Sequence, residues 1–286
     1  MKLVNVSLKP FAFLLLVTVM AMTVTHDVVY GADNEQKVAA TMPEVLVSGK
    51  KDKKSYKPTG VSSVKYSGPL RDIPQSISVV PQSVMVDQGA TTLRETLRNV
   101  PGISIQAGEG GVPAGDNLSI RGFNSRNDIF VDGVRDFGGY TRDPFNMQQL
   151  EVSKGPTSSY AGRGSTGGSV NQVSKTPRLD RFFSGGVGFG SGYYKRTTLD
   201  INQPISIGIP GTAVRLNTML HDSDNIGRDL GQNKRLGIAP SIAFGLGTAL
   251  RATISYFHMD QDNLPDYGIP WVPNANATGP LAGYGE

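Results

Sequence analysis

The chain has 286 residues, a net charge of +4 and no cysteine. The lack of cysteine excludes zinc-thiolate sites, cysteine nucleophiles and a disulfide framework. The three histidines, His26, His221 and His258, leave little for a histidine metal site or a catalytic triad, so no enzyme is predicted. The lysines at positions 50–57 are interpreted as part of a solvated linker, and no nucleic-acid partner is expected.

The first thirty residues predict export. The basic residues Lys2 and Lys9 precede an apolar run from Phe11 to Met22, and a polar stretch then leads to Gly31. This order indicates a secretory signal peptide covering residues 1–31. A membrane anchor is the alternative, but the apolar run has only about 12 residues, whereas a bilayer span needs roughly 18 or more.

Residues 32–60 are polar, rich in lysine and without periodicity, which predicts a flexible segment. One apolar patch, at 43–49, interrupts it with the sequence Pro-Glu-Val-Leu-Val-Ser-Gly. This short β-prone run could add as a strand to the edge of another sheet. A strand buried within a compact domain would have the same composition, so the residues that follow must decide its meaning.

Residues 61–178 predict a compact α+β domain of short strands and tight turns. Its clearest helix begins with a capping box formed by Thr92 and Glu95, and Pro101-Gly102 ends it. A second short helix is expected at Asp143-Pro144, a capping residue followed by proline at the first helical position. Short strands are expected at Leu118–Arg121, Ile129–Val131 and Leu150–Ser153, with Asp132-Gly133 as a turn signal.

Five short motifs in this region resemble, in sequence and in order, the plug domains of TonB-dependent siderophore receptors. They are Asp72-Ile73-Pro74-Gln75-Ser76, Asn99-Val100-Pro101-Gly102-Ile103, Ile120-Arg121-Gly122-Phe123, Val131-Asp132-Gly133-Val134-Arg135 and Lys154-Gly155-Pro156. A glycine-rich run at 162–168 follows, and it lacks the lysine and the spacing of a phosphate-binding loop. Within the family, residues 135–143 and 162–166 resemble the catecholate-receptor branch.

The resemblance implies roles for particular residues. The patch at 43–49 falls where such receptors carry the TonB box, so Glu44, Val45, Leu46, Val47 and Ser48 are expected to pair with the periplasmic energy-coupling protein. No covalently bound cofactor is expected, since the ferric siderophore is the transported ligand. The ligand-binding candidates are Gln106, Arg126, Tyr140 and Arg142. Arg121 and Lys154 lie in motifs that the family uses for contacts between plug and barrel.

After Pro177 the sequence changes to two-residue alternation, which is typical of membrane β-barrel strands with apolar side chains toward lipid and polar ones inward. A soluble β-sandwich alternates too. One face collects Phe183, Val187, Phe189, Leu199, Ile201, Val214, Leu216, Leu220, Leu236, Ile238, Ile242, Phe244, Leu250, Ile254 and Tyr256. Short links at 207–211 and 245–248 predict periplasmic turns, and 222–234 and the segment beyond Asp260 predict extracellular loops.

The resemblance implies a barrel of about 22 strands, of which residues 179–286 supply about five. Five strands cannot close, so the chain is expected to be an N-terminal fragment of an outer-membrane receptor that contacts outer-membrane lipid. The predicted function is TonB-dependent uptake of an iron siderophore, with a ferric catecholate as the first choice. A hydroxamate or citrate-type siderophore, cobalamin, and a soluble periplasmic binding module remain alternatives.

Overall fold

The computed structural model describes residues 56–58, 60–63, 66, 68–105, 115–156, 165–227 and 231–264, and the backbone of 271–274 and 277–280. All of them lie in one compact unit, Lys53–Glu286. The predicted signal peptide and TonB box fall outside the described residues. Within the described ranges no helix is both long and apolar enough to cross a membrane.

The N-terminal part of this unit is the predicted α+β domain, built from short elements around two small sheets. In the first sheet the strand order is β1-β7-β8-β5-β6, with β5 and β8 parallel, and in the second it is β2-β3-β4. The strands are β1 (Ser76–Pro81), β2 (Ile103–Ile105), β3 (Leu118–Ile120), β4 (Phe123–Asn124), β5 (Ile129–Val131), β6 (Val134–Arg135), β7 (Met147–Lys154) and β8 (Gly168–Ser174). The helices are η1 (Leu70–Asp72), α2 (Gln82–Asp87), α3 (Leu93–Leu97) and η2 (Pro144–Asn146), where η marks a 3₁₀ helix.

The capping box at the start of α3 is confirmed with one change. Thr92 Oγ1 accepts a hydrogen bond from Glu95 N at 3.2 Å, but the Glu95 carboxylate reaches one residue further back, to Thr91 N at 2.6 Å. The helix buries Leu93 and Leu97 in a core that includes Leu118, Ile120, Leu150, Val152 and Val170. Helix α2 was not predicted, because it follows Pro81 with no side-chain cap and buries only Met85.

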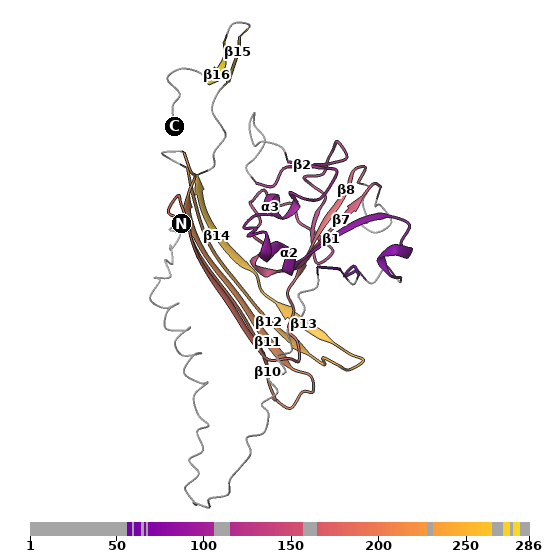
Figure 1. Ribbon diagram of the computed structural model, residues 1–286. Helices are drawn as coiled ribbons and strands as arrows, with labels where there is room; N and C mark the ends of the chain where they lie inside the picture. Colours follow the sequence, from indigo (N-terminus) through magenta and orange to yellow (C-terminus); the bar gives the residue numbers. More distant parts are fainter. Residues whose placement is uncertain are drawn as a thin grey trace, which may run out of the picture. The chain divides into compact units, whose positions relative to one another are not determined.

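The C-terminal part is an antiparallel sheet in which neighbours along the chain pair with each other (Figure 1). Its strands are β9 (Phe182–Phe189), β10 (Lys195–Pro204), β11 (Ala213–Asp224), β12 (Gln232–Phe244), β13 (Ala252–Ser255) and β14 (His258–Leu264). A separate hairpin joins β15 (Trp271–Asn274) to β16 (Ala277–Pro280). The predicted plug-like domain followed by antiparallel strands is confirmed.

Strands β13 and β14 both pair with β12, and they form one strand with a gap. Ser255 pairs with Ser241 and His258 with Ile238, so the register is continuous across the break. Pro240 lies opposite the gap, and it has no N–H with which to complete the ladder there. Tyr256 N still donates to Pro240 O at 2.9 Å, so pairing with β12 continues across the gap. If β13 and β14 are counted as one strand, the sheet has five strands, as the alternation predicts.

The predicted alternation of faces is confirmed, and the polar face is the covered one. The side chains of Asp200, Arg215, Asn217 and Arg235 are buried, whereas Leu220 between them is exposed. Two predicted loop boundaries are wrong. Asp222 pairs with Lys234, so the link between β11 and β12 is only 225–231, and β14 continues past Asp260 to Leu264. Charged side chains on the polar face made strand ends look like loops.

Candidate functional site

The plug-like domain is bound to the sheet through a carboxylate that is shared by two arginines. Asp143 precedes η2 and caps it by accepting a hydrogen bond from Phe145 N at 3.0 Å. Arg196 of β10 binds both oxygens of this carboxylate, at 2.6 and 2.9 Å, and Arg235 of β12 donates to Oδ2 at 3.0 Å. We call Asp143, Arg196 and Arg235 the Asp143 centre. It connects the domain to two strands, and the Asp143 side chain is wholly inaccessible to solvent.

Phe145 extends this contact with apolar packing. It lies against Met219 and Ala239 in a small buried cluster and stacks on Phe257 with ring centroids 5.8 Å apart. A Cβ atom at Gly237 of β12 would lie 2.6 Å from ring carbon Cε1 of Phe145, so any other residue there would require the ring or the strand to shift. Gly237 is therefore the position that lets the ring approach the sheet backbone.

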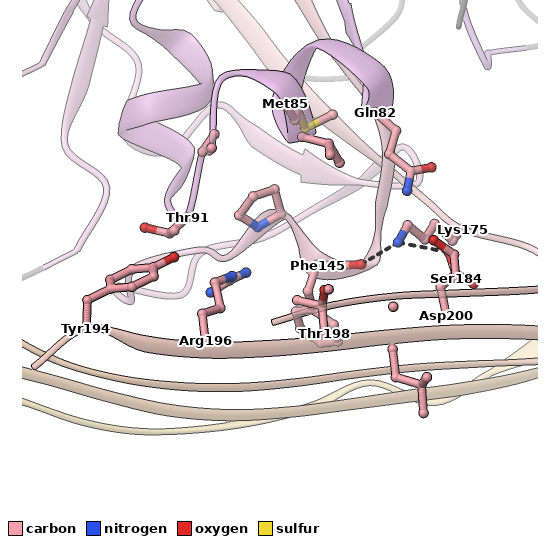
Figure 2. A pocket seen from close by; sticks show the side chains of 17 residues that line it. Gln82, Met85, Thr91, Phe145, Lys175, Ser184, Tyr194, Arg196, Thr198 and Asp200 are labelled. Carbon is pink, nitrogen blue, oxygen red and sulfur yellow. Dashed lines mark hydrogen bonds and ion pairs between the residues drawn. The ribbon is translucent and has the colours of Figure 1, made fainter. Parts of the chain in front are cut away.

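In a second charged group the domain supplies a cation and the sheet supplies the carboxylate. Lys175, just after β8, donates from Nζ to Phe145 O at 2.7 Å and lies 3.1 Å from Asp200 Oδ2 (Figure 2). Arg215 binds both oxygens of the Asp200 carboxylate at 2.8 Å and donates to Thr176 O at 2.9 Å. We call Lys175, Asp200 and Arg215 the Lys175 centre. Burial lowers the pKa of Lys175, and the Asp200 charge offsets this only in part.

A cavity of about 250 Å³ lies between α2 and the first two strands of the sheet. Met85 and Gln82 border it from α2, while Tyr194 and Thr198 border it from β10 and the residues just before it (Figure 2). Arg196 and Lys175 also line it, but each is engaged by a carboxylate. Among the described residues, no three His, Cys, Asp or Glu side chains gather as a metal site.

One residue before Asp143, Arg142 organises a third polar cluster, which lies wholly within the domain. Its side chain is 2% exposed. Nη2 and Nε bind Asp136 Oδ2 at 2.8 and 3.1 Å, and Nη1 lies 3.3 Å from Asp116 Oδ2. The guanidinium also lies 4.3 Å from the centroid of the Tyr140 ring. These four residues, Asp116, Asp136, Tyr140 and Arg142, are the Arg142 cluster.

The two carboxylates of the Arg142 cluster are shifted in opposite directions. Burial raises the pKa of Asp116, although Arg142 opposes this shift. Burial also acts on Asp136, but bonds from Gly138 N–H and Tyr140 O–H, together with Arg142, outweigh it and lower the pKa of Asp136. Burial and the bond to Asp136 raise the pKa of Tyr140 to about 12, so its hydroxyl stays protonated as a donor at neutral pH.

The sequence-predicted site residues fall into three groups. Glu44 to Ser48 and Gln106 lie outside the described residues. Arg126 and Tyr140 are partly exposed, and Arg142 is buried beneath Tyr140. Of the two residues expected to contact the barrel, Lys154 donates to Ser78 Oγ at 3.0 Å within the domain, and Arg121 is exposed.

The sequence did not predict which residues make the contacts between domain and sheet in the described ranges. Asp143 was identified as a helix cap and as part of the catecholate-like stretch 135–143, but not as a contact to the sheet, and no such role was predicted for Lys175, Arg196 or Arg235. One signal was present. Three arginines lie within the alternating strands and not in loops: Arg196, Arg215 and Arg235. A charged side chain on the inward face of such a strand needs a partner of opposite charge.

Comparison with known proteins gives the fold a family. Residues 69–169 match the TonB-dependent receptor plug domain model. The chain carries a TonB-dependent receptor plug domain. Its strands continue the resemblance, because the crystal structure of the ferric-catecholate import receptor Fiu from Escherichia coli K12, in its closed form, superimposes with a TM-score of 0.71 at 44% identity over 75% of this chain and 30% of that one.

Two further relatives agree. The catecholate siderophore receptor Fiu of Escherichia coli O157:H7 is 44% identical over 230 residues, which are 80% of this chain and 30% of the relative. The siderophore receptor PiuA of Acinetobacter baumannii superimposes with a TM-score of 0.72 at 42% identity, covering 76% of this chain and 31% of that structure. The chain thus spans about 30% of the length of the relatives it matches. These relatives are receptors, not enzymes.

Proposed function

We propose that this chain is the N-terminal part of an outer-membrane receptor that imports a ferric siderophore by TonB-dependent transport. The observation that carries the proposal is a plug domain bound through two buried ion-pair centres to the polar face of a sheet whose opposite face is apolar. An alternating sheet of this kind suits a lipid-facing wall around a filled lumen. The ligand named for the Fiu relatives, a ferric catecholate, supplies the ligand class.

The residue roles follow from this proposal. Residues 1–31 direct export, and residues 32–60 place the TonB box in the periplasm. Glu44 to Ser48 pair with the coupling protein by strand addition, in which main-chain amides carry most of the affinity. The plug covers 61–178, and the strands from 179 onward belong to the barrel wall.

The ligand side of the proposal rests on the Arg142 cluster and its neighbours. A ferric catecholate is anionic with aromatic rims, and such a ligand is matched by arginine and aromatic side chains. Arg126 and Tyr140 are partly exposed and suit direct contact, together with Gln106. Arg142 is buried and already paired with two carboxylates, so it is not available to contact the ligand directly. These facts favour an indirect role in which Arg142 fixes the position of Tyr140. Contacts by Arg121 and Lys154 with further strands remain part of the proposal.

The decisive test is uptake of radioactive iron by cells that produce the full receptor. Uptake of a ferric catecholate should depend on both the receptor and the coupling protein, whereas a ferric hydroxamate should not be imported. Uptake that persists after deletion of the coupling protein would contradict the energised mechanism. Import of the hydroxamate alone would leave the receptor class intact and overturn the ligand class.

The TonB box can be tested separately with Leu46→Pro. Proline has no amide to donate, so it removes a ladder bond and disfavours extended pairing by Val45 and Val47. Binding of the ferric catecholate to whole cells should persist while uptake falls to background. Parental uptake by the Leu46→Pro receptor would show that residues 44–48 are not the coupling segment.

A further inference from the structure

The chain that enters the plug crosses the sheet on the face opposite the apolar core. Residues 60–63, which we call the strap, lie over β7 and β8. Ser62 N donates to Glu151 Oε1 at 2.5 Å, and Ser62 Oγ donates to Oε2 at 3.2 Å. Gln149 Nε2 donates to Gly60 O at 3.3 Å. Asn171 Nδ2 of β8 also donates to Ser62 Oγ, at 3.4 Å. The strap is thus attached by side chains of β7 and β8, mostly through the Glu151 carboxylate.

Glu151 is unusual for its position. It lies between Leu150 and Val152, which point into the core, so strand alternation places it on the other face. The residue is nevertheless only 5% exposed. Besides the two donors of Ser62, Gln149 Nε2 and Asn171 Nδ2 bind its carboxylate at 2.7 and 3.0 Å. All four donors are neutral, and half of them belong to the strap.

This arrangement makes the hydrogen bonds between Ser62 and Glu151 strong while the strap is bound, yet the strap can be released at a small cost in free energy. A carboxylate that accepts several hydrogen bonds holds its donors firmly. If the strap lifts, water can replace the two donors of Ser62 at the Glu151 carboxylate. No apolar core residue needs to move, since the core lies on the opposite face of β7. The strap can therefore detach while the sheet remains folded.

The strap is also close in sequence to the proposed coupling segment. Ser62 follows Gly49 by 13 residues, which can span at most about 45 Å when fully extended. Tyr56 lies between them and donates to Asp87 Oδ2 at 2.6 Å, but this contact is exposed to solvent. A pull on residues 44–48 thus meets the exposed Tyr56 contact before the part-buried Glu151 contact.

We propose that Glu151 is a positioning residue that holds the strap on the plug sheet, and that its release from Ser62 is an early step when the N-terminal segment is pulled. The second half of this inference rests on the proposed TonB coupling, whereas the first half does not. Glu151 touches neither the Arg142 cluster nor the two ion-pair centres in the described contacts, so its variants should leave ligand binding unchanged.

The strap itself is tested by amide hydrogen exchange on the full receptor, which needs neither the coupling protein nor a siderophore. Glu151→Gln should raise exchange at residues 60–63 by about tenfold or more, because the charged acceptor of the Ser62 amide is lost. Ser62→Ala keeps that amide and should raise it less. Exchange at Val170 in the core should not change in either variant. Asp72→Asn removes the same charge from an exposed site and serves as the matched control.

Unchanged exchange at 60–63 in Glu151→Gln would overturn the strap, and so would an equal rise at Val170, which would indicate general destabilisation. The coupling role is then read from uptake at limiting coupling protein. Glu151→Gln should change the uptake rate at least twofold with ligand affinity unaltered, and an unchanged rate would overturn the early-release step. If the parental receptor itself shows no TonB-dependent uptake, the proposed function fails while the exchange result stands.

Discussion

Arg142 and Asp143 are neighbours in the chain, and they build two charge clusters of opposite design. At Arg142 one cation is shared by two carboxylates, and all three groups belong to the plug. At Asp143 one carboxylate is shared by two arginines, and both arginines belong to the sheet. The first cluster fixes a loop within one domain and the second joins two parts of the molecule. Buried ion pairs thus fix the shape of a plug loop in the Arg142 cluster and attach the plug to the sheet in the Asp143 centre.

Each group carries one unpaired charge, negative in the Arg142 cluster and positive in the Asp143 centre, and the two are stabilised in different ways. Asp136 keeps 20% of its side chain exposed, so water solvates part of the extra negative charge of the Arg142 cluster. Asp143 and Arg235 have almost no exposure, so the extra positive charge of the Asp143 centre must be satisfied by protein groups. Thr91 O does this by accepting a hydrogen bond from Arg235 at 2.8 Å. Loss of charge balance should therefore be most costly at Asp143.

The largest expected effect comes from Asp143→Asn. This change removes the carboxylate that Arg196 and Arg235 share, and breaking a buried ion pair in this way costs about 3–5 kcal/mol. The free energy of unfolding of the purified receptor, measured by urea titration, should fall by that amount. Asp180→Asn breaks an exposed pair with Arg178 and should cost less than about 1 kcal/mol. Equal losses in both variants would refute the attachment role of Asp143.

Neither cluster could be predicted in full from the sequence, and the reason is distance along the chain. The cap of α3 was predictable because Thr92 and Glu95 are three positions apart. Asp143 and Arg235 are 92 positions apart, and one sequence gives no indication that they meet. The alternation after Pro177 correctly assigned Arg215 and Asn217 to the inner face, since that inference needs only neighbouring residues. What the inner face would bind depended on how the plug packs against it.

The second effect is Arg142→Ala, which should weaken binding of a ferric catecholate by about 1.5–3 kcal/mol, because it removes the charge-assisted bonds to Asp116 and Asp136 that keep the Tyr140 region in place. Titration of the purified receptor with the ligand measures it. Asp136→Asn distinguishes how Arg142 acts. If Arg142 works by holding Tyr140 in place, Asp136→Asn should reproduce part of the loss. Parental affinity in a normally folded Arg142→Ala receptor would remove Arg142 from the ligand-binding candidates.

A smaller effect is expected where the attachment is apolar. Gly237→Ala places a methyl group against the Phe145 ring, and such overpacking costs about 1–3 kcal/mol. Gly186→Ala in β9 is the matched control, because an added Cβ there would lie 3.4 Å from Thr198 Oγ1 and needs little movement. Phe145→Leu should restore part of the stability lost in Gly237→Ala. Identical unfolding curves for the two glycine variants would show that the ring can move away freely.

The smallest effect is a pH dependence that separates the two carboxylates of the Arg142 cluster. Asp136 has a pKa below the ordinary 3.8, so its stabilisation is present above that value and is lost as the pH falls through its folded pKa. Asp116 has a pKa above 3.8, so protonation favours its folded form, and its contribution is lost as the pH rises through its folded pKa. The two pH ranges lie on opposite sides of 3.8, and in each the free energy of unfolding can change by at most about 1.4 kcal/mol per pH unit.

Urea titrations between about pH 2.5 and 6 measure the free energy of unfolding across both ranges. Asp136→Asn should flatten its rise with pH below 3.8, while Asp116→Asn should flatten its fall with pH above 3.8. A common slope change in both variants would mean that the cluster titrates as one unit, and the division of roles between its buried and its partly exposed carboxylate would then be wrong.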